Sequence, residues 1–204
     1  MTEAEWLTCN EPEAMLEFCQ HNAWNARRTR LLAVACCRLV WGALTERDRD
    51  AVEVSERYAD EQASEEEFRR VACFMMCGCP SDADWVVATA RAGGAWIFER
   101  HLVESFANLY SPTAVEVALD VVVGLIREVF GNPFHPVAFR PEWRTDTAVT
   151  LAAQMYESRN FSAIPILADA LQDAGCNNDI LDHCRGPGPH VRGCWVVDLV
   201  LRKE

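Results

Sequence analysis

The densest group of potential metal ligands lies near the C-terminus, between residues 176 and 194. It contains three cysteines and two histidines, whose sulfur and nitrogen atoms are the donors that zinc prefers: Cys176, His183, Cys184, His190 and Cys194. Their spacing, C-x6-H-C-x5-H-x3-C, matches no common zinc finger, ribbon or knuckle, in which paired ligands lie two to four residues apart. Two alternatives stay open: a structural zinc site, or a tight corner of core thiols and helix-end histidines, which the spacing favours.

The same segment offers two further kinds of chemistry. Cys194 follows Arg192 and His190 at the predicted start of the last helix, a setting that can lower the pKa of a thiol and make it reactive. Arg185, His190 and Arg192 also surround a glycine- and proline-rich turn, where they could hold a phosphate or the carboxylate of a partner. Against this, acidic residues are plentiful nearby, so we favour local pairing of these arginines.

The rest of the chain carries no recognisable catalytic motif. Cys73, Cys77 and Cys79 have a C-x3-C-x-C spacing that fits no known iron–sulfur pattern. The sequence lacks a G-x-S-x-G elbow, a phosphate-binding loop of the G-x-x-x-x-G-K-[ST] type and an H-E-x-x-H pair. We therefore assign no catalytic residue, and the sequence indicates a protein that is not an enzyme and needs no cofactor beyond the zinc considered above.

Composition sets the compartment and the class of partner. The chain has 204 residues, half of them apolar, and a formal net charge of −12, which opposes binding to nucleic acid or to an anionic membrane. It begins without the features of a secretory signal, and its longest apolar stretch is interrupted by charges. We expect a cytoplasmic protein whose ten cysteines are mostly reduced and buried.

Helix signals run along most of the sequence. Thr2 with Glu5 and Ser64 with Glu67 have capping-box spacing, Thr45 can cap another helix, and Gly131 can end one. These signals and the apolar periodicity predict an all-α fold, an irregular bundle of about eight helices. Residues 131–146 hold three prolines and predict a bridging loop between an N-terminal bundle (1–130) and a C-terminal subdomain (147–204), which pack as one compact unit.

Several segments resemble a family of uncharacterised bacterial proteins with many paralogues. They include the start, "MTEAEWLTCNEPEAMLEF", the helix "LLAVACCRLVW", the turn "FGNPF" and the end, "DILDHCRGPGPHVRGCWVVDLVL". Members of this family are similar at both ends, and the resemblance covers most of the chain outside residues 70–110. It implies a bacterial, cytoplasmic protein and no particular activity.

These observations favour a non-enzymatic protein-interaction or adaptor module with an unknown protein partner. Phe134 and Trp143, in the bridging loop, are the aromatic residues that we expect to anchor that partner. A zinc-binding or thiol-reactive protein that uses the C-terminal corner is the main alternative. An acidic mimic of nucleic acid, suggested by the net charge, is a further one.

Overall fold

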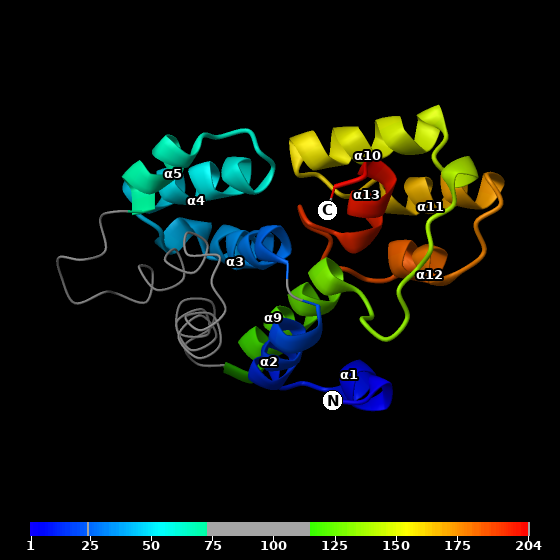
Figure 1. Ribbon diagram of the computed structural model, residues 1–204, viewed down its shortest axis with the longest axis horizontal. Helices are drawn as coiled ribbons and strands as arrows, with labels where there is room; N and C mark the ends of the chain where they lie inside the picture. Colours follow the sequence, from blue (N-terminus) through cyan, green and yellow to red (C-terminus); the bar gives the residue numbers. More distant parts are fainter. Residues whose placement is uncertain (24, 73–114, 204) are drawn as a thin grey trace. The chain divides into compact units, whose positions relative to one another are not determined.

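The computed structural model describes residues 1–23, 25–72 and 115–203 (Figure 1). The described residues form ten α-helices and two short 3-10 helices and contain no strand, which confirms the all-α fold. The α-helices are α1 (Glu3–Thr8), α2 (Pro12–Asn22), α3 (Ala26–Leu39), α4 (Glu46–Ala59), α5 (Glu65–Ala72), α9 (Val115–Phe130), α10 (Asp146–Ser158), α11 (Ile164–Asp173), α12 (Asp179–Arg185) and α13 (Trp195–Leu201). They are slightly more numerous than the eight or so predicted, and four of them have only six to eight residues.

The chain divides into two compact units, Met1–Arg127 and Glu128–Glu204. The boundary lies in the last turn of α9, so the bridging loop, with its 3-10 helix η3 (Pro141–Trp143), belongs to the second unit. Cys73, Cys77 and Cys79 lie outside the described residues. Within the described part of the chain, no helix is long and apolar enough to cross a membrane.

In the first unit, α3 supplies the most continuous buried surface. Every residue from Leu31 to Cys37 is buried, and α3 packs against α4, which in turn packs against α5. The predicted caps form: Thr2 with Glu5 and Thr45 with Asp48 make reciprocal capping boxes. These local bonds satisfy helix N-terminal N–H groups, which is why the sequence alone locates these helix starts.

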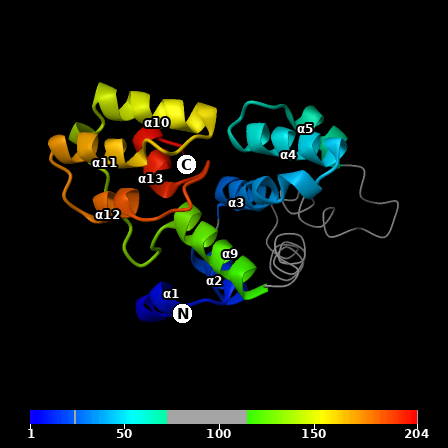
Figure 2. The ribbon, with the colours of Figure 1, turned by 180° about the vertical axis from the view of Figure 1, so that it is seen from behind.

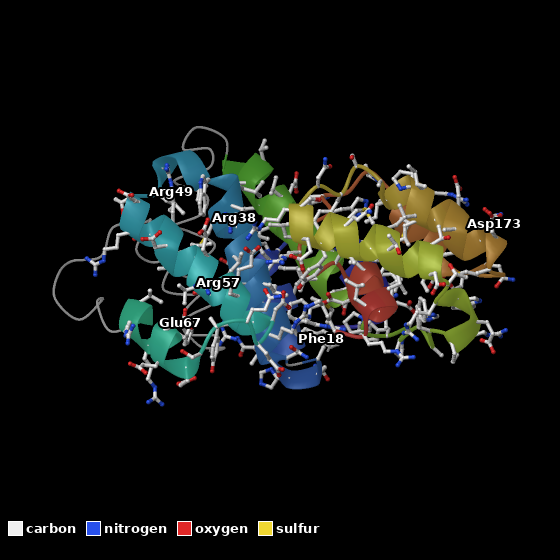
Figure 3. All side chains as sticks on the ribbon, turned by 90° about the horizontal axis from the view of Figure 1, so that it is seen from above. Phe18, Arg38, Arg49, Arg57, Glu67 and Asp173 are labelled. Carbon is white, nitrogen blue, oxygen red and sulfur yellow. The ribbon has the colours of Figure 1, made fainter. Side chains whose placement is uncertain are left out.

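Charged side chains connect the helices of the first unit. On α4, Glu56 is buried and its carboxylate lies 2.8 Å from the guanidinium of Arg38 on α3. The half-exposed Arg57 lies 3.5 Å from Glu67 of α5 (Figure 3). Arg127, in α9, donates hydrogen bonds to the backbone carbonyls of Trp6, Leu7 and Cys9 at the end of α1. That guanidinium satisfies carbonyls that a helix end leaves without an intrahelical partner.

The second unit is a small four-helix cluster with its own core. Helix α10 packs against α11 and α13, and α12 packs against α11 and α13, so that α13 lies between α10 and α12 (Figure 2). Apolar side chains from all four helices fill the centre, including the fully buried Tyr156, Ile164 and Leu167. The core also takes in Trp143, which is 5% exposed and meets Phe139 edge to face.

Trp143, in the bridging loop, is buried rather than exposed. The sequence predicts this ring as an exposed anchor for a partner, whereas the structure places it in the core of the second unit. Phe134 is half-buried. An aromatic ring in a proline-rich loop serves either purpose, and here Trp143 belongs to the buried core of the second unit.

Gly131 ends α9 as predicted and allows a close approach to Trp195. Its φ of +68° lies in the left-handed region, which glycine adopts without a steric penalty. A Cβ atom on Gly131 would lie 3.2 Å from Cγ of Trp195. Gly175 also has a positive φ, +89°, but a Cβ atom on Gly175 would meet no other atom within 4 Å.

The pair Gly131→Ala and Gly175→Ala separates backbone strain from side-chain crowding. We expect Gly175→Ala to lower the free energy of unfolding by about 1–2 kcal/mol through its left-handed backbone alone. Gly131→Ala should lose roughly 1 kcal/mol more, because the new methyl group crowds the indole of Trp195. Urea unfolding of both variants measures the difference. Equal losses would contradict the close packing of Gly131 on Trp195.

Candidate metal centre

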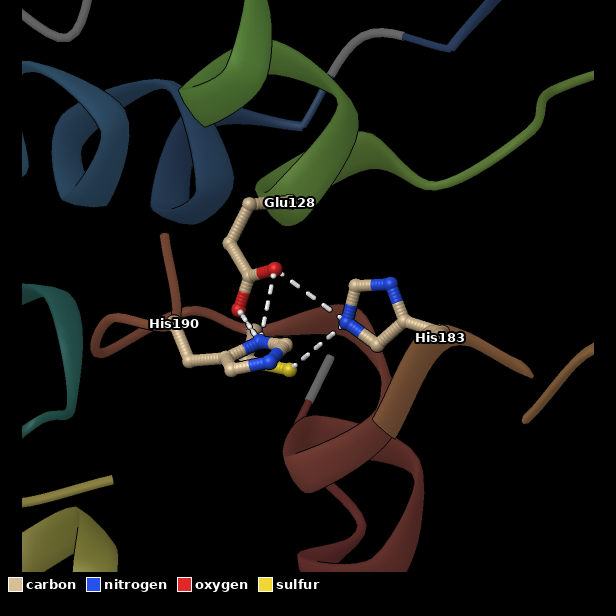
Figure 4. A group of neighbouring side chains, drawn as sticks. Glu128, His183 and His190 are labelled. Carbon is tan, nitrogen blue, oxygen red and sulfur yellow. Dashed lines mark hydrogen bonds and ion pairs between the residues drawn. The ribbon is translucent and has the colours of Figure 1, made fainter. Parts of the chain in front are cut away.

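Four potential metal ligands from separate parts of the second unit meet at one place (Figure 4). They are Glu128 in the last turn of α9, His183 in α12, His190 in the turn that follows α12, and Cys194 at the start of α13. One carboxylate oxygen, two ring nitrogens and one sulfur all lie within 4.8 Å of one another. Three of the five ligands considered from the sequence are therefore brought together, and Glu128 joins them.

The donor atoms are separated by distances close to those in a tetrahedral metal site. Nε2 of His183 lies 3.1 Å from Oε2 of Glu128 and 3.4 Å from Sγ of Cys194. Nδ1 of His190 lies 3.2 Å from both carboxylate oxygens of Glu128. A tetrahedron with metal–ligand bonds of roughly 2.0–2.3 Å has edges of roughly 3.3–3.8 Å, so a small inward or outward shift of each side chain would fit zinc.

Without a metal, these contacts are hydrogen bonds to a buried carboxylate. The side chain of Glu128 is 3% exposed and accepts hydrogen bonds from both histidines and from the backbone N–H of Val191. Burial alone would raise the pKa of Glu128, but the hydrogen bonds from His183 and His190 outweigh it and lower the pKa. For His190, burial lowers the pKa. The hydrogen bond and the negative charge of Glu128, together with the Gly186 backbone, outweigh burial, so the pKa of His190 is raised.

Cys194 is a thiol rather than a thiolate in this environment. Its side chain is fully buried, and burial raises its pKa well above the ordinary value. The negative charge of Glu128 raises the pKa further, because a thiolate beside a carboxylate would be repelled. The reactive thiol considered from the sequence requires a lowered pKa and access to solvent, and Cys194 has neither.

Trp195 defines which nitrogen of His183 carries the proton. The indole Nε1–H donates a hydrogen bond to Nδ1 of His183 at 3.1 Å. An indole N–H is only a donor, so Nδ1 must be the unprotonated nitrogen, and the proton of the neutral ring lies on Nε2. That Nε2–H faces Oε2 of Glu128 and Sγ of Cys194.

The arrangement does not have the geometry of a cysteine nucleophile with its base. Such a site needs one histidine that contacts the thiol through one nitrogen and a carboxylate through the other. Here Glu128 and Cys194 both approach the same nitrogen of His183, while the other nitrogen binds Trp195. His190 contacts Glu128 through Nδ1, and its buried Nε2 has no hydrogen-bond partner among the described residues. Neither ring therefore connects Cys194 to Glu128 through its two nitrogens.

The other residues singled out in the sequence have structural surroundings. Cys176 and Cys184 are buried in the core of the second unit, and burial raises the pKa of the Cys184 thiol to about 12. Arg185 pairs with Asp169 of α11 at 3.0 Å, and the buried Arg192 donates to the carbonyl of Tyr156. The two guanidinium groups therefore engage partners on different helices.

Glu128 was not among the predicted ligands because nothing local marks it. It lies far before the other three in the sequence, inside an apolar helical stretch in which a single carboxylate suggests a solvated edge. Its one distinguishing feature is its position three residues before Gly131, where the helix ends and the chain turns.

No family model, no curated protein and no solved structure matches this chain. The resemblance to an uncharacterised bacterial family, based on the two ends of the sequence, therefore stays a prediction. The site is interpreted from its own geometry.

The burial of Cys194 can be measured by its reactivity. In protein treated with a chelator at neutral pH, we expect N-ethylmaleimide to modify Cys194 at least about tenfold more slowly than the half-buried Cys9. Cys184 is equally buried and lies outside the ligand group, so it should react as slowly as Cys194. Peptide mass spectrometry follows each residue over time. Labelling of Cys194 faster than of a free model thiol would instead identify a reactive cysteine.

Replacing Glu128 by Gln should give a pH-dependent loss of stability in metal-free protein. The lowered pKa of Glu128 gives stability that is present above its ordinary value of 4.5 and lost as pH falls through the native pKa. The raised pKa of His190 gives stability that is present below 6.5 and lost as pH rises through the native pKa. We expect Glu128→Gln to lower the free energy of unfolding by about 1.5–3 kcal/mol between pH 4.5 and pH 6.5. The loss should be smaller below and above this pH range.

Denaturant unfolding at several pH values measures this difference. Glu157→Gln is the matched control, because Glu157 is exposed and lies 3.9 Å from its cationic partner, Arg192. Its effect should be small at every pH. A loss for Glu128→Gln that does not vary with pH would show that the buried carboxylate is not coupled to the imidazoles.

Proposed function

We propose that this protein binds one zinc ion through Glu128, His183, His190 and Cys194, and that the metal has a structural role. The observation that carries this proposal is the convergence of four donor atoms of the types zinc prefers, all within 4.8 Å of one another. The donors come from α9, α12, the turn after α12 and the start of α13. A metal bound there would hold these four segments of the second unit together.

Charge balance supports a divalent cation at this place. Glu128 and Cys194 are both buried, and a thiolate of Cys194 beside the carboxylate of Glu128 would be unfavourable without a cation. With Cys194 as thiolate, Glu128 as carboxylate and both imidazoles neutral, the ligands carry two negative charges. A divalent ion makes the buried site neutral, which a hydrogen-bond network alone achieves only by keeping the thiol protonated.

The ligand set favours zinc over other common ions. One sulfur, two imidazole nitrogens and one carboxylate oxygen suit zinc or cobalt, whereas magnesium and calcium require oxygen ligands. Four protein ligands complete a tetrahedron and leave no position for a water molecule or a substrate. The proposed site is therefore closed and non-catalytic, in agreement with the lack of catalytic motifs in the sequence.

The small size of the second unit supports a stabilising role for the metal. A domain of fewer than about 80 residues buries a limited apolar core, and metal ligation is one of the common ways in which such domains gain stability. The turn between α12 and α13 contains glycine and proline and little regular structure. A metal bound at both ends of that turn would fix it without a larger core.

The zinc proposal is tested by metal content in a pair of cysteine variants. Cys194→Ala should lose stoichiometric zinc, because it removes the only sulfur ligand, whereas Cys184→Ala should keep it, because Cys184 is equally buried but lies outside the group. Inductively coupled plasma mass spectrometry of protein refolded with zinc and then desalted should give one zinc per chain for the wild type and for Cys184→Ala.

Cobalt substitution provides an independent check of the geometry. The wild-type cobalt protein should show the intense visible bands of a tetrahedral site and a sulfur-to-cobalt charge-transfer band, and the latter should be absent in Cys194→Ala. A wild type that binds no metal, or equal metal content in all three proteins, would overturn the proposal.

A further inference from the structure

The hydrogen bond between Trp195 and His183 conflicts with metal binding at Nε2. A histidine that binds a metal through one nitrogen keeps its proton on the other, and that N–H normally donates to a carboxylate, a carbonyl or a water molecule. His183 has the opposite arrangement, because its second nitrogen accepts a hydrogen bond from the indole N–H of Trp195. The proton then lies on Nε2, the atom that faces Glu128 and Cys194.

Coordination at Nε2 therefore requires His183 to exchange its tautomer. The ring loses the proton from Nε2 and gains one at Nδ1, so it stays neutral, while Cys194 releases its thiol proton to solvent. After this exchange Nδ1–H of His183 and Nε1–H of Trp195 would be two donors facing each other at the present distance of 3.1 Å. Two donors repel, so the indole has to move when the metal binds.

Trp195 lies next to the proposed site, so a movement of its side chain would affect the residues around it. It is the first residue of α13 and adjoins the ligand Cys194. Its ring lies 5.0 Å from the ring of His183 and packs on Gly131. The side chain is half-buried, so part of it is in contact with solvent.

We infer that Trp195, the first residue of α13, responds to metal binding. Its indole holds His183 in the tautomer that cannot bind a metal through Nε2, and zinc binding releases the indole from His183. This inference rests on the proposed zinc site and adds a regulatory element to it. The metal-free protein has the Trp195–His183 bond, and the zinc-bound protein has a free indole N–H. The hydrogen bond opposes zinc, so affinity is lower than the four ligands alone would give.

Removing the indole N–H should therefore strengthen zinc binding. Trp195→Phe keeps an aromatic ring against Gly131 and leaves Nδ1 of His183 without a donor in front of it. We expect the variant to bind zinc about fivefold more tightly, the effect of losing one opposing neutral hydrogen bond. Trp143→Phe is the control, because Trp143 is buried in the same unit and packs on Phe139 rather than on the site. Its affinity for zinc should equal that of the wild type.

A second measurement, made on the wild-type protein, does not depend on comparing the zinc affinities of variants. With ¹⁵N-labelled tryptophan, the indole N–H resonance of Trp195 can be assigned by its absence in Trp195→Phe. On addition of zinc it should shift upfield and exchange faster with solvent, as a broken hydrogen bond requires. Long-range ¹H–¹⁵N spectra should show the proton of His183 on Nε2 before zinc and on Nδ1 after it.

The outcomes distinguish a failure of the proposed zinc site from a failure of the coupling through Trp195. If the full-length wild type does not bind zinc in a competition titration against a chelator, the metal site itself is wrong. If the wild type binds zinc while the Trp195 resonance stays in place and Trp195→Phe binds no more tightly, the metal site stands and the coupling is overturned.

Discussion

The buried carboxylate of Glu128 is the group on which the geometry of the second unit depends. An ionised carboxylate away from water is stable only if its oxygens accept strong hydrogen bonds or bind a cation. Here it accepts hydrogen bonds from both imidazoles (Figure 4) and from the backbone N–H of Val191. These contacts join the end of α9 to α12 and to the turn before α13. Gly131 follows Glu128 three residues later, with a positive φ, and its backbone lies close to the indole of Trp195.

In the proposed metal site, the neighbours Cys194 and Trp195 have opposite effects on zinc binding. The thiol of Cys194 completes a ligand set that suits zinc, and its own ionisation is opposed by Glu128 until a cation is present. The indole of Trp195 stabilises the form of His183 that cannot coordinate. The metal-free state is thus a hydrogen-bonded network, and in the proposed site the metal affinity is the difference between two ordered arrangements.

The parts of the fold that the sequence predicts are those controlled by local contacts. Thr2 and Thr45 cap their helices through residues three positions later, and Gly131 ends α9 because the next turn needs a positive φ. The all-helical class follows from the same signals. The position of Trp143 does not, because an aromatic residue in a loop is exposed or buried according to its tertiary contacts, and the core that includes Trp143 extends along the chain to Val200.

The candidate site shows the same limit of sequence reasoning. His183, His190 and Cys194 are recognisable as donors from their types and proximity, but five nearby candidates leave the choice open. Apolar packing removes Cys176 and Cys184 from that choice, and only the folded chain brings Glu128 to the other three. The pairing of Arg185 with Asp169 likewise depends on the packing of α12 against α11.

The most direct test of the metal site is anomalous diffraction from crystals of the zinc-loaded protein, measured on both sides of the zinc absorption edge. The proposal predicts one strong peak per chain, about 2.3 Å from Sγ of Cys194 and about 2.0 Å from the nearest atoms of Glu128, His183 and His190. The absence of a peak there, or a single peak at other cysteines, would contradict it.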